Sequence, residues 1–246
     1  MAQLYGLIGY PLSHSFSQRY FAGKFADEGL TACRYELFPL QRIDELPALL
    51  AAHGDLVGLN VTIPYKEKVL EYLDELDPAA AEIGAVNVIQ IRNGYLKGYN
   101  SDALGFDESL SGWLPAGEMR ALVLGSGGAS KAVCWALRKR KIAYRLVSRR
   151  PQGGELSYEQ LNAGLLAEHR LIVNTTPLGM QPEVSSCPPI PYSFLEAKHY
   201  LYDLVYNPEE TTFLKLGAAR ACQTKNGLEM LYRQAEKAWQ IWQSAL

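Results

Sequence analysis

The sequence predicts an α/β protein of two domains, each built on a β-sheet. Its 246 residues correspond to roughly 1.6 domains of about 150 residues, so one large domain or two small ones are expected. Short apolar runs alternate with amphipathic stretches along the chain, which is typical of the α/β class. The alternation starts again near residue 119, and the break over residues 101–118 predicts the domain boundary.

The first domain is expected over residues 1–102. Strand, helix, strand, helix and strand are predicted in turn over residues 4–9, 19–29, 33–38, 43–54 and 56–63. Residues 87–99 contain two further apolar runs joined by Asn93 and Gly94, and an Asn-Gly pair favours the tight turn of a β-hairpin. The hairpin adds an antiparallel element, so we expect a mixed sheet.

The second domain is expected over residues 103–225. Its predicted elements are a strand at 119–125, a helix at 130–141, and strands at 144–148, 171–174 and 200–206. Beyond it, apolar side chains recur at helical spacing from Leu228 to Ile241, which predicts a terminal helix within residues 227–246. The spacing alone does not say where that helix packs.

Composition and charge exclude several classes of protein. Hydrophobic residues make up 48% and charged residues 20% of the chain, which excludes disordered, collagen-like and coiled-coil proteins. A net charge of -2 argues against nucleic acid as the main partner. No apolar run approaches the roughly 18 residues that cross a bilayer, and no basic start of a secretory signal is present, so we expect no membrane contact and a cytoplasmic location.

The four cysteines are scattered and form no Cys-x-x-Cys pair. Such an arrangement favours neither a disulfide scaffold nor a zinc site. We therefore expect free thiols, most of them in the core, and no metal.

The segment VLGSGGASKA, residues 123–132, is the strongest local signal. Gly125, Gly127 and Gly128 follow an apolar strand and open a helix, so backbone amides and the positive helix end can approach a pyrophosphate. We therefore predict a Rossmann-like second domain that binds a dinucleotide. The alternative is a bare tight turn, because Gly-x-Gly-Gly departs from the usual Gly-x-Gly-x-x-Gly pattern.

The end of the next predicted strand indicates which dinucleotide binds. A carboxylate at this place accepts hydrogen bonds from the ribose of NAD, but this chain has Ser148, Arg149 and Arg150. A guanidinium group is the natural partner of a ribose 2′-phosphate, so NADP is favoured. The alternative is two solvated surface arginines.

Polar side chains gather in the first domain around a proline that ends a strand. In NVTIPYKEK, Asn60 and Thr62 suit substrate hydroxyl groups, and Lys66 can donate a proton to a forming alkoxide. Asn87 and Asp102 follow in further polar segments. Each residue is ordinary in isolation, since a lysine after such a turn is usually only exposed. Their joint occurrence is what points to a site.

Eight segments of the chain carry a more specific signal together than any one of them does. They are GYPLSHSFS, NVTIPYKEKV, GAVNVI, NSDALGF, GSGGASKA, NTTPLGM, DLVYNPEETTFL and NGLEMLYRQA. In this order and at this spacing they resemble the motifs of the shikimate dehydrogenase family, along nearly the whole chain. The resemblance implies an NADP-dependent oxidoreductase of chorismate and aromatic amino acid biosynthesis that reduces 3-dehydroshikimate to shikimate reversibly.

The resemblance also implies roles for individual residues. Lys66 and Asp102 would form the catalytic pair. The shikimate-binding residues would be Ser13, Ser15, Asn60, Thr62, Lys66, Asn87, Asp102, Tyr206 and Gln234. The NADP-binding residues would be Gly125, Ser126, Gly127, Gly128, Ala129, Ser148, Arg149, Arg150, Asn174, Thr175, Thr176, Val205, Gly227 and Met230. Because Gln234 lies in the terminal helix, we expect residues 226–246 to return to the first domain.

The sequence departs from the family pattern at three places. Gln18 stands where proline is usual, Glu229 stands where glycine is frequent, and Val88 follows Asn87 where threonine is commoner. None of these removes a chemical group assigned above. Glu229 and Val88 place new side chains close to the expected cleft, so the substrate preference follows less directly than the reaction type.

Hydride transfer to a ketone leaves negative charge on oxygen, which must be stabilised or protonated. Lys66 and Asp102 are the candidates that recur in the cleft motifs, whereas His53, His169 and His199 fall outside every motif. We expect the substrate in the first domain and NADPH in the second, with the two domains facing and closing on each other.

Two rival functions remain open at this stage. One is a relative that oxidises quinate or another hydroxylated cyclic acid, with NAD as a possible cofactor. The other is a sensor of shikimate or nucleotide that has lost turnover. The oligomeric state stays open between monomer and homodimer.

Overall fold

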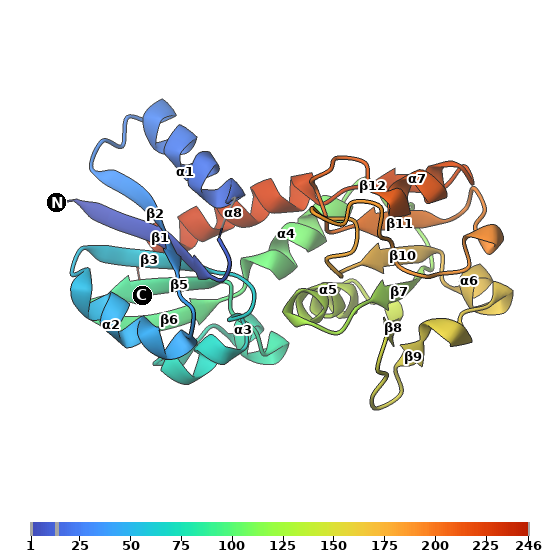
Figure 1. Cartoon of the computed structure of the whole chain (residues 1–246), viewed down its shortest axis with the longest axis horizontal. Coiled ribbons are helices and arrows are strands. Elements are labelled where there is room, and N and C mark those ends of the chain that lie inside the picture. The colour runs from blue at the N-terminus through green and yellow to red at the C-terminus, as the bar shows by residue number, and fades with distance from the viewer. Residues whose placement is uncertain (1, 13–14, 246) are drawn as a thin grey trace. The chain divides into compact units, whose positions relative to one another are not determined.

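The structure is a computed structural model that describes residues 2–12 and 15–245. The chain divides into two compact units, shown in Figure 1. Unit 1 comprises the residues up to Ser101 together with those from Gln234 onward, and unit 2 comprises Asp102–Arg233. The predicted first domain, residues 1–102 and 226–246, included Asp102 and residues 226–233, whereas the structure assigns them to unit 2. Residues 226–233 lie with unit 2, where Met230 packs into the core.

Unit 1 contains a mixed sheet with the strand order β2-β1-β3-β5-β6-β4. The strands are β1 (Gln3–Gly9), β2 (Cys33–Pro39), β3 (Leu56–Val61), β4 (Glu75–Leu76), β5 (Val88–Arg92) and β6 (Tyr95–Tyr99). β1 pairs in parallel with β2 and β3, whereas β3, β5 and β6 alternate in direction. Asn93 and Gly94 both have positive φ angles of 51° and 80° between β5 and β6, which confirms the predicted hairpin.

Successive residues of the central strand β1 supply the two cores of unit 1. Leu4 and Ile8 enter one core, and Tyr5 and Leu7 enter the other, as the two-residue period of a strand requires. The helical elements are α1 (Phe16–Asp27), η1 (Ile43–Glu45), α2 (Leu46–Ala52), η2 (Lys68–Tyr72) and α3 (Pro78–Ile83). α1 and the C-terminal part of α8 pack into the core that contains Tyr5, and α2 and η2 pack into the other core. Figure 1 labels α1, α8 and α2 around this sheet.

The terminal helix α8 (Leu228–Gln243) returns to the first sheet, as expected. Trp242 is fully buried there, and its indole Nε1 donates to the backbone oxygen of Ile89 at 3.0 Å. The amide of Gln90, also fully buried, donates to the backbone oxygens of Ile241 and Ser244 at 2.7 Å each. The two bonds from Gln90 reach carbonyl groups at and just beyond the end of α8, where the regular bonds of a helix run out.

Unit 2 contains a parallel sheet with the strand order β12-β11-β10-β7-β8-β9. The strands are β7 (Arg120–Leu124), β8 (Ala143–Ser148), β9 (Leu156–Ser157), β10 (Leu171–Asn174), β11 (Tyr200–Asp203) and β12 (Gln223–Lys225). All the pairings between them are parallel. The chain starts in the middle at β7, moves to one edge, returns to β10 and then moves to the other edge. This is the doubly wound order of dinucleotide-binding domains, so the Rossmann-like prediction is confirmed.

The central strands β7 and β10 are buried on both faces, which explains why residues 121–124 and 171–173 are continuous apolar runs. Along β7, Ala121 and Val123 enter one core while Leu122 and Leu124 enter the other. The helical elements are α4 (Ser101–Leu110), α5 (Gly128–Lys139), η3 (Tyr158–Gln160), α6 (Ala163–Glu168), η4 (Tyr192–Phe194) and α7 (Thr212–Ala218).

The sequence did not predict the short edge strands β4, β9 and β12, nor the helices α3, α4, α6 and α7. Each of the three strands has two or three residues and pairs with one neighbour only. Such segments carry no periodic pattern of their own. They are strands because a longer strand lies beside them.

The cysteines have no disulfide partner. Cys134 and Cys222 are buried, and Cys33 and Cys187 are half-buried, so fewer of them lie in the core than expected. Among the described residues, no helix is long and apolar enough to span a bilayer, and no cluster of His, Cys, Asp or Glu side chains could hold a metal ion.

Candidate active site

The loops that follow β7 and β10 meet at the point where the strand order of unit 2 reverses. In doubly wound sheets, ligands bind at this switch point, beyond the carboxyl ends of the strands. Thr175 joins the two loops, because its backbone N–H and its hydroxyl both donate to the backbone oxygen of Leu124, at 2.9 and 2.7 Å. The glycine-rich turn and the Asn174-Thr175-Thr176 segment therefore lie side by side.

Gly125 occupies a position that only glycine can take. Its φ angle of +110° is unfavourable for a residue with a side chain. An added Cβ would also lie 2.7 Å from the hydroxyl of Thr175 and 3.0 Å from the methyl group of Thr176. This glycine thus lets the β7 turn pass close to the β10 loop.

Gly127 is different, because nothing in the described chain requires a glycine there. It is the N-cap residue of α5, with an ordinary φ angle of −88°, and an added Cβ would meet no described atom within 4 Å. Ser126 and Gly127 are exposed, and Gly128 and Ala129 are half-buried. The first N–H groups of α5 have no helical partner, so this open, uncovered helix start fits the pyrophosphate of a dinucleotide.

Ser148, Arg149 and Arg150 lie at the end of β8, next to this turn. Ser148 is buried, and its hydroxyl donates to Glu155 at 2.7 Å. Arg149 and Arg150 are exposed. The hydroxyl of Ser148 is therefore engaged by the protein itself, while the two guanidinium groups are accessible to an anion.

Asn174 lies beneath the protein surface, and its side chain holds the loop after β10 in place. It is fully buried, and its Nδ2 donates to Asp203 at 2.9 Å. Its Oδ1 accepts from the backbone N–H and the hydroxyl of Thr176 at 3.0 and 2.7 Å. Both atoms of the amide are thus used within the protein, so Asn174 shapes the loop that carries Thr175 and Thr176.

Asp203, at the end of β11, is a residue that the sequence analysis missed. Its carboxylate is fully buried and accepts from Asn174, from the backbone N–H of Val205 at 3.0 Å and from the hydroxyl of Thr211 at 2.6 Å. Burial raises the pKa of Asp203 to about 6, against the effect of these three hydrogen bonds, which favour the charged form. An acidic residue directly after the apolar run YLY was the signal available in the sequence.

The start of α8 packs closely on the loop after β11. The N–H of Gly227 donates to the backbone oxygen of Val205 at 3.3 Å. An added Cβ at Gly227 would lie 2.2 Å from the backbone oxygen of Leu204. Met230 is buried in the core of unit 2, and Tyr206 is half-buried.

In unit 1, the structure brings together two of the predicted substrate residues, Asn87 and Gln234. The amide Nδ2 of Asn87 donates to the hydroxyl of Ser101 at 3.0 Å and lies 3.5 Å from Oε1 of Gln234. The Oδ1 of Asn87 accepts from the backbone N–H of Ser101 at 2.7 Å. All three residues are buried. Residues from three distant parts of the sequence thus form one polar cluster.

Asn60, on β3, lies beside this cluster and has a fixed orientation. Its Oδ1 accepts from the hydroxyl of Tyr35 at 2.7 Å, and its Nδ2 lies 3.4 Å from the backbone oxygen of Asn87. Tyr35 is buried, and burial raises the pKa of its hydroxyl group. The neutral hydroxyl therefore acts as a donor that holds the amide of Asn60 in place.

The remaining predicted residues are held by backbone bonds or lie at helix starts. Thr62 and Lys66 are half-buried; the N–H of Thr62 donates to Ile8 at 2.9 Å, and the backbone oxygen of Lys66 accepts from Val86 at 2.7 Å. Asp102 is buried in the first turn of α4, in unit 2. A carboxylate is favourable there because of the helix dipole. Ser13 lies outside the described residues.

Comparisons with known proteins decide which family this arrangement belongs to. A family model described as "Shikimate dehydrogenase substrate binding domain" matches residues 7–89. The shikimate dehydrogenase (NADP(+)) of Moorella thermoacetica is 40% identical, over 97% of this chain and 87% of its own length. The chain belongs to the shikimate dehydrogenase family.

Solved structures of the family share the fold. Shikimate 5-dehydrogenase from Thermus thermophilus, in complex with NADP(H) and shikimate, has a TM-score of 0.87 and 33% identity, covering 99% of this chain and 94% of that one. Quinate dehydrogenase from Corynebacterium glutamicum, in complex with NAD, has a TM-score of 0.87 and 28% identity, covering 98% and 94%. The fold of shikimate dehydrogenases is therefore also that of an enzyme named for another substrate.

The first departure from the shikimate dehydrogenase pattern has a visible structural effect. Ser15 is the N-cap residue of α1, and its side-chain oxygen accepts from the backbone N–H of Gln18 at 3.3 Å. A proline at position 18 would have no N–H to donate. In this chain the serine expected at the substrate therefore also caps a helix.

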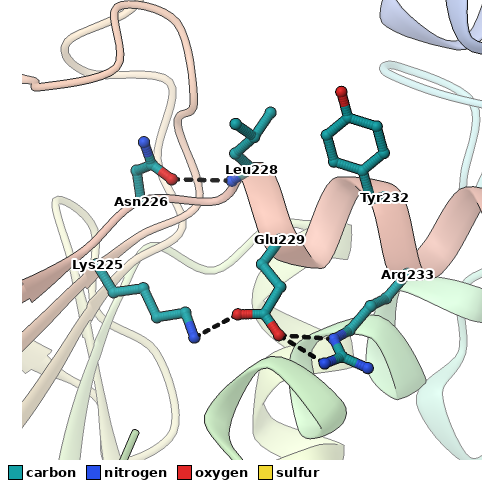
Figure 2. A pocket seen from close by; sticks show the side chains of 6 residues that line it. All are labelled: Lys225, Asn226, Leu228, Glu229, Tyr232 and Arg233. Carbon is teal, nitrogen blue, oxygen red and sulfur yellow. Dashed lines mark hydrogen bonds and ion pairs between the residues drawn. The ribbon is translucent and has the colours of Figure 1, made fainter.

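The second departure, Glu229, belongs to an ion-pair cluster at the start of α8. Figure 2 shows Lys225 and Arg233 pointing toward Glu229 from two sides. The shortest N–O distances are 2.6 Å for Lys225 and 2.7 Å for Arg233. These residues line an open hollow of about 570 Å³. Burial by itself would raise the pKa of Glu229, but the hydrogen bonds from Lys225 and Arg233 outweigh it and lower the pKa. The charge of this extra carboxylate is thus neutralised within unit 2.

Proposed function

We propose that this chain is an NADP-dependent shikimate dehydrogenase, which transfers hydride reversibly between NADPH and 3-dehydroshikimate, the reaction of chorismate and aromatic amino acid biosynthesis. The observation that carries this function is the similarity to an enzyme of that name across 97% of the chain. The doubly wound sheet and its open glycine-rich turn supply a suitable place for the cofactor.

The polar residues of unit 1 suit a small polyhydroxylated acid. Asn60, Asn87 and Gln234 offer amide groups that can each donate and accept, as vicinal hydroxyl groups require. The hydrogen bonds from the hydroxyl of Tyr35 to Asn60 and from the backbone N–H of Ser101 to Asn87 fix two of these amides, so little side-chain entropy is lost when a ligand binds. Ser15 and Thr62 supply further neutral hydroxyl groups, and we assign the substrate carboxylate to Ser13 and Ser15, with Tyr206 nearby.

Lys66 and Asp102 carry the proton transfer in this proposal. In shikimate oxidation, the C–H bond of the reacting carbon breaks with both electrons leaving as hydride, while the hydroxyl proton passes to a base. In the reverse direction, an ammonium group at the carbonyl oxygen stabilises the developing negative charge and donates the proton. We assign that donor to Lys66, with Asp102 as its partner in the proton exchange.

The cofactor is assigned to unit 2. NADP(H), when bound there, supplies or accepts the hydride. The helix start at Gly127 and Gly128 would hold the pyrophosphate, Arg149 and Arg150 the 2′-phosphate, and the loops after β10 and β11 the nicotinamide side. Because Thr175 and Gly125 are in contact, these parts of the cofactor site are fixed relative to each other.

A steady-state assay tests the function directly. The purified chain is mixed with shikimate and NADP, and formation of reduced nicotinamide is followed by its absorbance. Turnover with this pair is the expected result, and no turnover in either direction would overturn the proposal and favour a shikimate or nucleotide sensor.

A second candidate function, quinate oxidation with NAD, is favoured only by the similarity to the Corynebacterium glutamicum enzyme. Measuring kcat/KM for shikimate and quinate with each cofactor separates the two functions. We expect shikimate with NADP to be the best pair, because two arginines follow Ser148 where an NAD enzyme carries a carboxylate.

A further inference from the structure

We propose that Glu155 is a specificity-determining residue that sets the preference for NADP over NAD, by anchoring the loop that presents Arg149 and Arg150. The inference rests on the proposed function, and it concerns a residue that none of the motifs above contains. The inference is drawn from two hydrogen bonds that Oε2 of Glu155 accepts, one from each end of the segment that carries the arginines.

The loop over residues 149–154 has few other constraints. It connects β8 with β9, and these short strands pair in parallel through Val147 with Leu156 and Ser148 with Ser157. Gly153 and Gly154 have positive φ angles of 53° and 96°, and an added Cβ on either would meet no described atom within 4 Å. All six residues of the loop are exposed. Such a segment gains little order from packing.

Glu155 closes the loop onto the end of β8. Its Oε2 accepts from the hydroxyl of Ser148 at 2.7 Å and from the backbone N–H of Gln152 at 3.2 Å. The backbone N–H of Glu155 donates in turn to the oxygen of Gln152 at 3.0 Å. One half-buried carboxylate therefore ties the residue before the two arginines to the residue two positions after them.

The position of this closure makes it relevant to cofactor choice. β8 lies beside β7, and the end of the strand following the glycine-rich turn is where the adenosine ribose is read. A 2′-phosphate is held well by guanidinium groups only when these are already positioned, because ordering two long side chains and a loop costs conformational entropy. NAD has no such phosphate, so the cost falls on NADP binding alone.

The charge of Glu155 provides an opposite reading, in which the carboxylate repels the 2′-phosphate. The geometry favours the anchoring role, because Oε2 of Glu155 already accepts one hydrogen bond from Ser148 at the end of β8 and one from Gln152 in the loop. The two roles predict opposite effects of removing the charge, so they can be separated by substitution.

Two substitutions at this position provide the test. Glu155→Gln removes the charge but keeps an oxygen that can accept from Ser148 and Gln152. Glu155→Ala removes both. Glu118→Ala is the matched control, because Glu118 is an exposed carboxylate of the same unit and its loss changes the net charge equally.

The readout is the ratio of kcat/KM for NADP to kcat/KM for NAD, together with the ratio of the two dissociation constants measured by calorimetry. We expect Glu155→Ala to lower both ratios on the order of tenfold, the effect of losing the two hydrogen bonds from Ser148 and Gln152. Glu155→Gln and Glu118→Ala should keep the ratios, and the KM for shikimate should stay unchanged in all three variants.

Two outcomes would overturn the inference: unchanged ratios in a folded Glu155→Ala protein, or ratios that rise in Glu155→Gln because a repulsive charge is gone. The calorimetric ratio keeps the test independent of turnover. A wild-type chain that binds NADP but does not oxidise shikimate would refute the proposed function. The role of Glu155 would then be tested by the ratio of the two dissociation constants alone.

Discussion

The proposed reaction assigns its acid–base chemistry to Lys66 and Asp102, of which Lys66 belongs to unit 1 and Asp102 to unit 2. Lys66 follows β3 and is half-buried, and Asp102 begins α4 and is buried. The neutral amides and hydroxyl groups around Asn87 can bind a substrate, but they cannot deliver a proton at neutral pH. Removing the ammonium group should therefore affect turnover more than binding.

The substitution Lys66→Ala is expected to lower kcat by roughly 100-fold or more, the usual contribution of a general acid-base group, with a much smaller change in the KM for shikimate. Steady-state kinetics with saturating NADP measures the effect. Lys68→Ala is the control, since Lys68 is exposed two positions along the same segment. A Lys66→Ala enzyme with full kcat would remove Lys66 from the catalytic pair.

Asp203 makes the stability of unit 2 depend on pH in an unusual direction. Its pKa is raised from 3.8 to about 6 in the folded protein. Between these two pH values the folded state therefore holds a proton that the unfolded state has already lost. The favourable contribution is fully present below about pH 4 and is lost as the pH rises to about 6.

The prediction is that the free energy of unfolding of the wild type, minus that of Asp203→Asn, falls by about 2 kcal/mol between pH 4 and pH 7, since one pKa unit corresponds to about 1.4 kcal/mol and part of the shift already acts below pH 4. Urea unfolding of both proteins over this range measures the difference. A difference that stays constant with pH would show that Asp203 is charged throughout, and a rise would reverse the sign of its shift.

At the scale of elements, the turn between β7 and α5 contains one glycine that the fold requires and one that only the proposed cofactor requires. Gly125 is required by its positive φ angle and by its contact with Thr175. Gly127 is required by neither, since its backbone is ordinary and its surroundings are open. A substitution at Gly127 therefore probes the ligand without disturbing the fold.

Gly127→Ala is expected to leave the free energy of unfolding within about 1 kcal/mol of the wild type and to raise the KM for NADP on the order of tenfold, equal to about 1.4 kcal/mol of binding. Denaturant unfolding and kinetics check the two halves. Gly23→Ala in α1, another open glycine, should change neither the KM for NADP nor that for shikimate. An unchanged KM in Gly127→Ala would place the pyrophosphate elsewhere.

Many of the helices and strands could be predicted from the sequence, because turn residues and the spacing of apolar residues are local signals. The Asn93-Gly94 turn and the alternation of Leu4, Tyr5, Leu7 and Ile8 depend on neighbours along the chain and on the two-residue period of a strand. The edge strands β9 and β12 could not be predicted in the same way. Their residues become strands only when β8 and β11 lie beside them.

At the scale of the whole molecule, the terminal helix α8 takes part in both units. Its start packs in unit 2 through Met230, and its end packs in unit 1 through Trp242. Gln234, which the proposal places at the substrate, lies between them and begins the returning segment. The burial of Trp242 against the first sheet therefore stabilises unit 1 and fixes the helix segment that carries Gln234.

Trp242→Ala is expected to destabilise unit 1 by about 3–5 kcal/mol, through the cavity that it leaves and the loss of the hydrogen bond to Ile89. Thermal and urea unfolding followed by circular dichroism measure the loss, and the KM for shikimate should rise at temperatures where the variant is still folded. Gln240→Ala, an exposed position of the same helix, is the control. Equal stability of the two variants would contradict the role of Trp242 in holding α8.

The sequence by itself determined the α/β class, the glycine-rich turn, the hairpin and the family resemblance, because each depends on local backbone preference or on the order of short motifs. Only the tertiary structure decided the bonds of Asn87 with Ser101 and Gln234 and of Asn174 with Asp203. It also decided that Asp102 belongs to unit 2. A hydrogen bond between buried polar groups depends on which strands are neighbours, and strand order is a property of the folded chain. The same reason explains why Glu155, which no motif contains, became visible only when β9 lay beside β8.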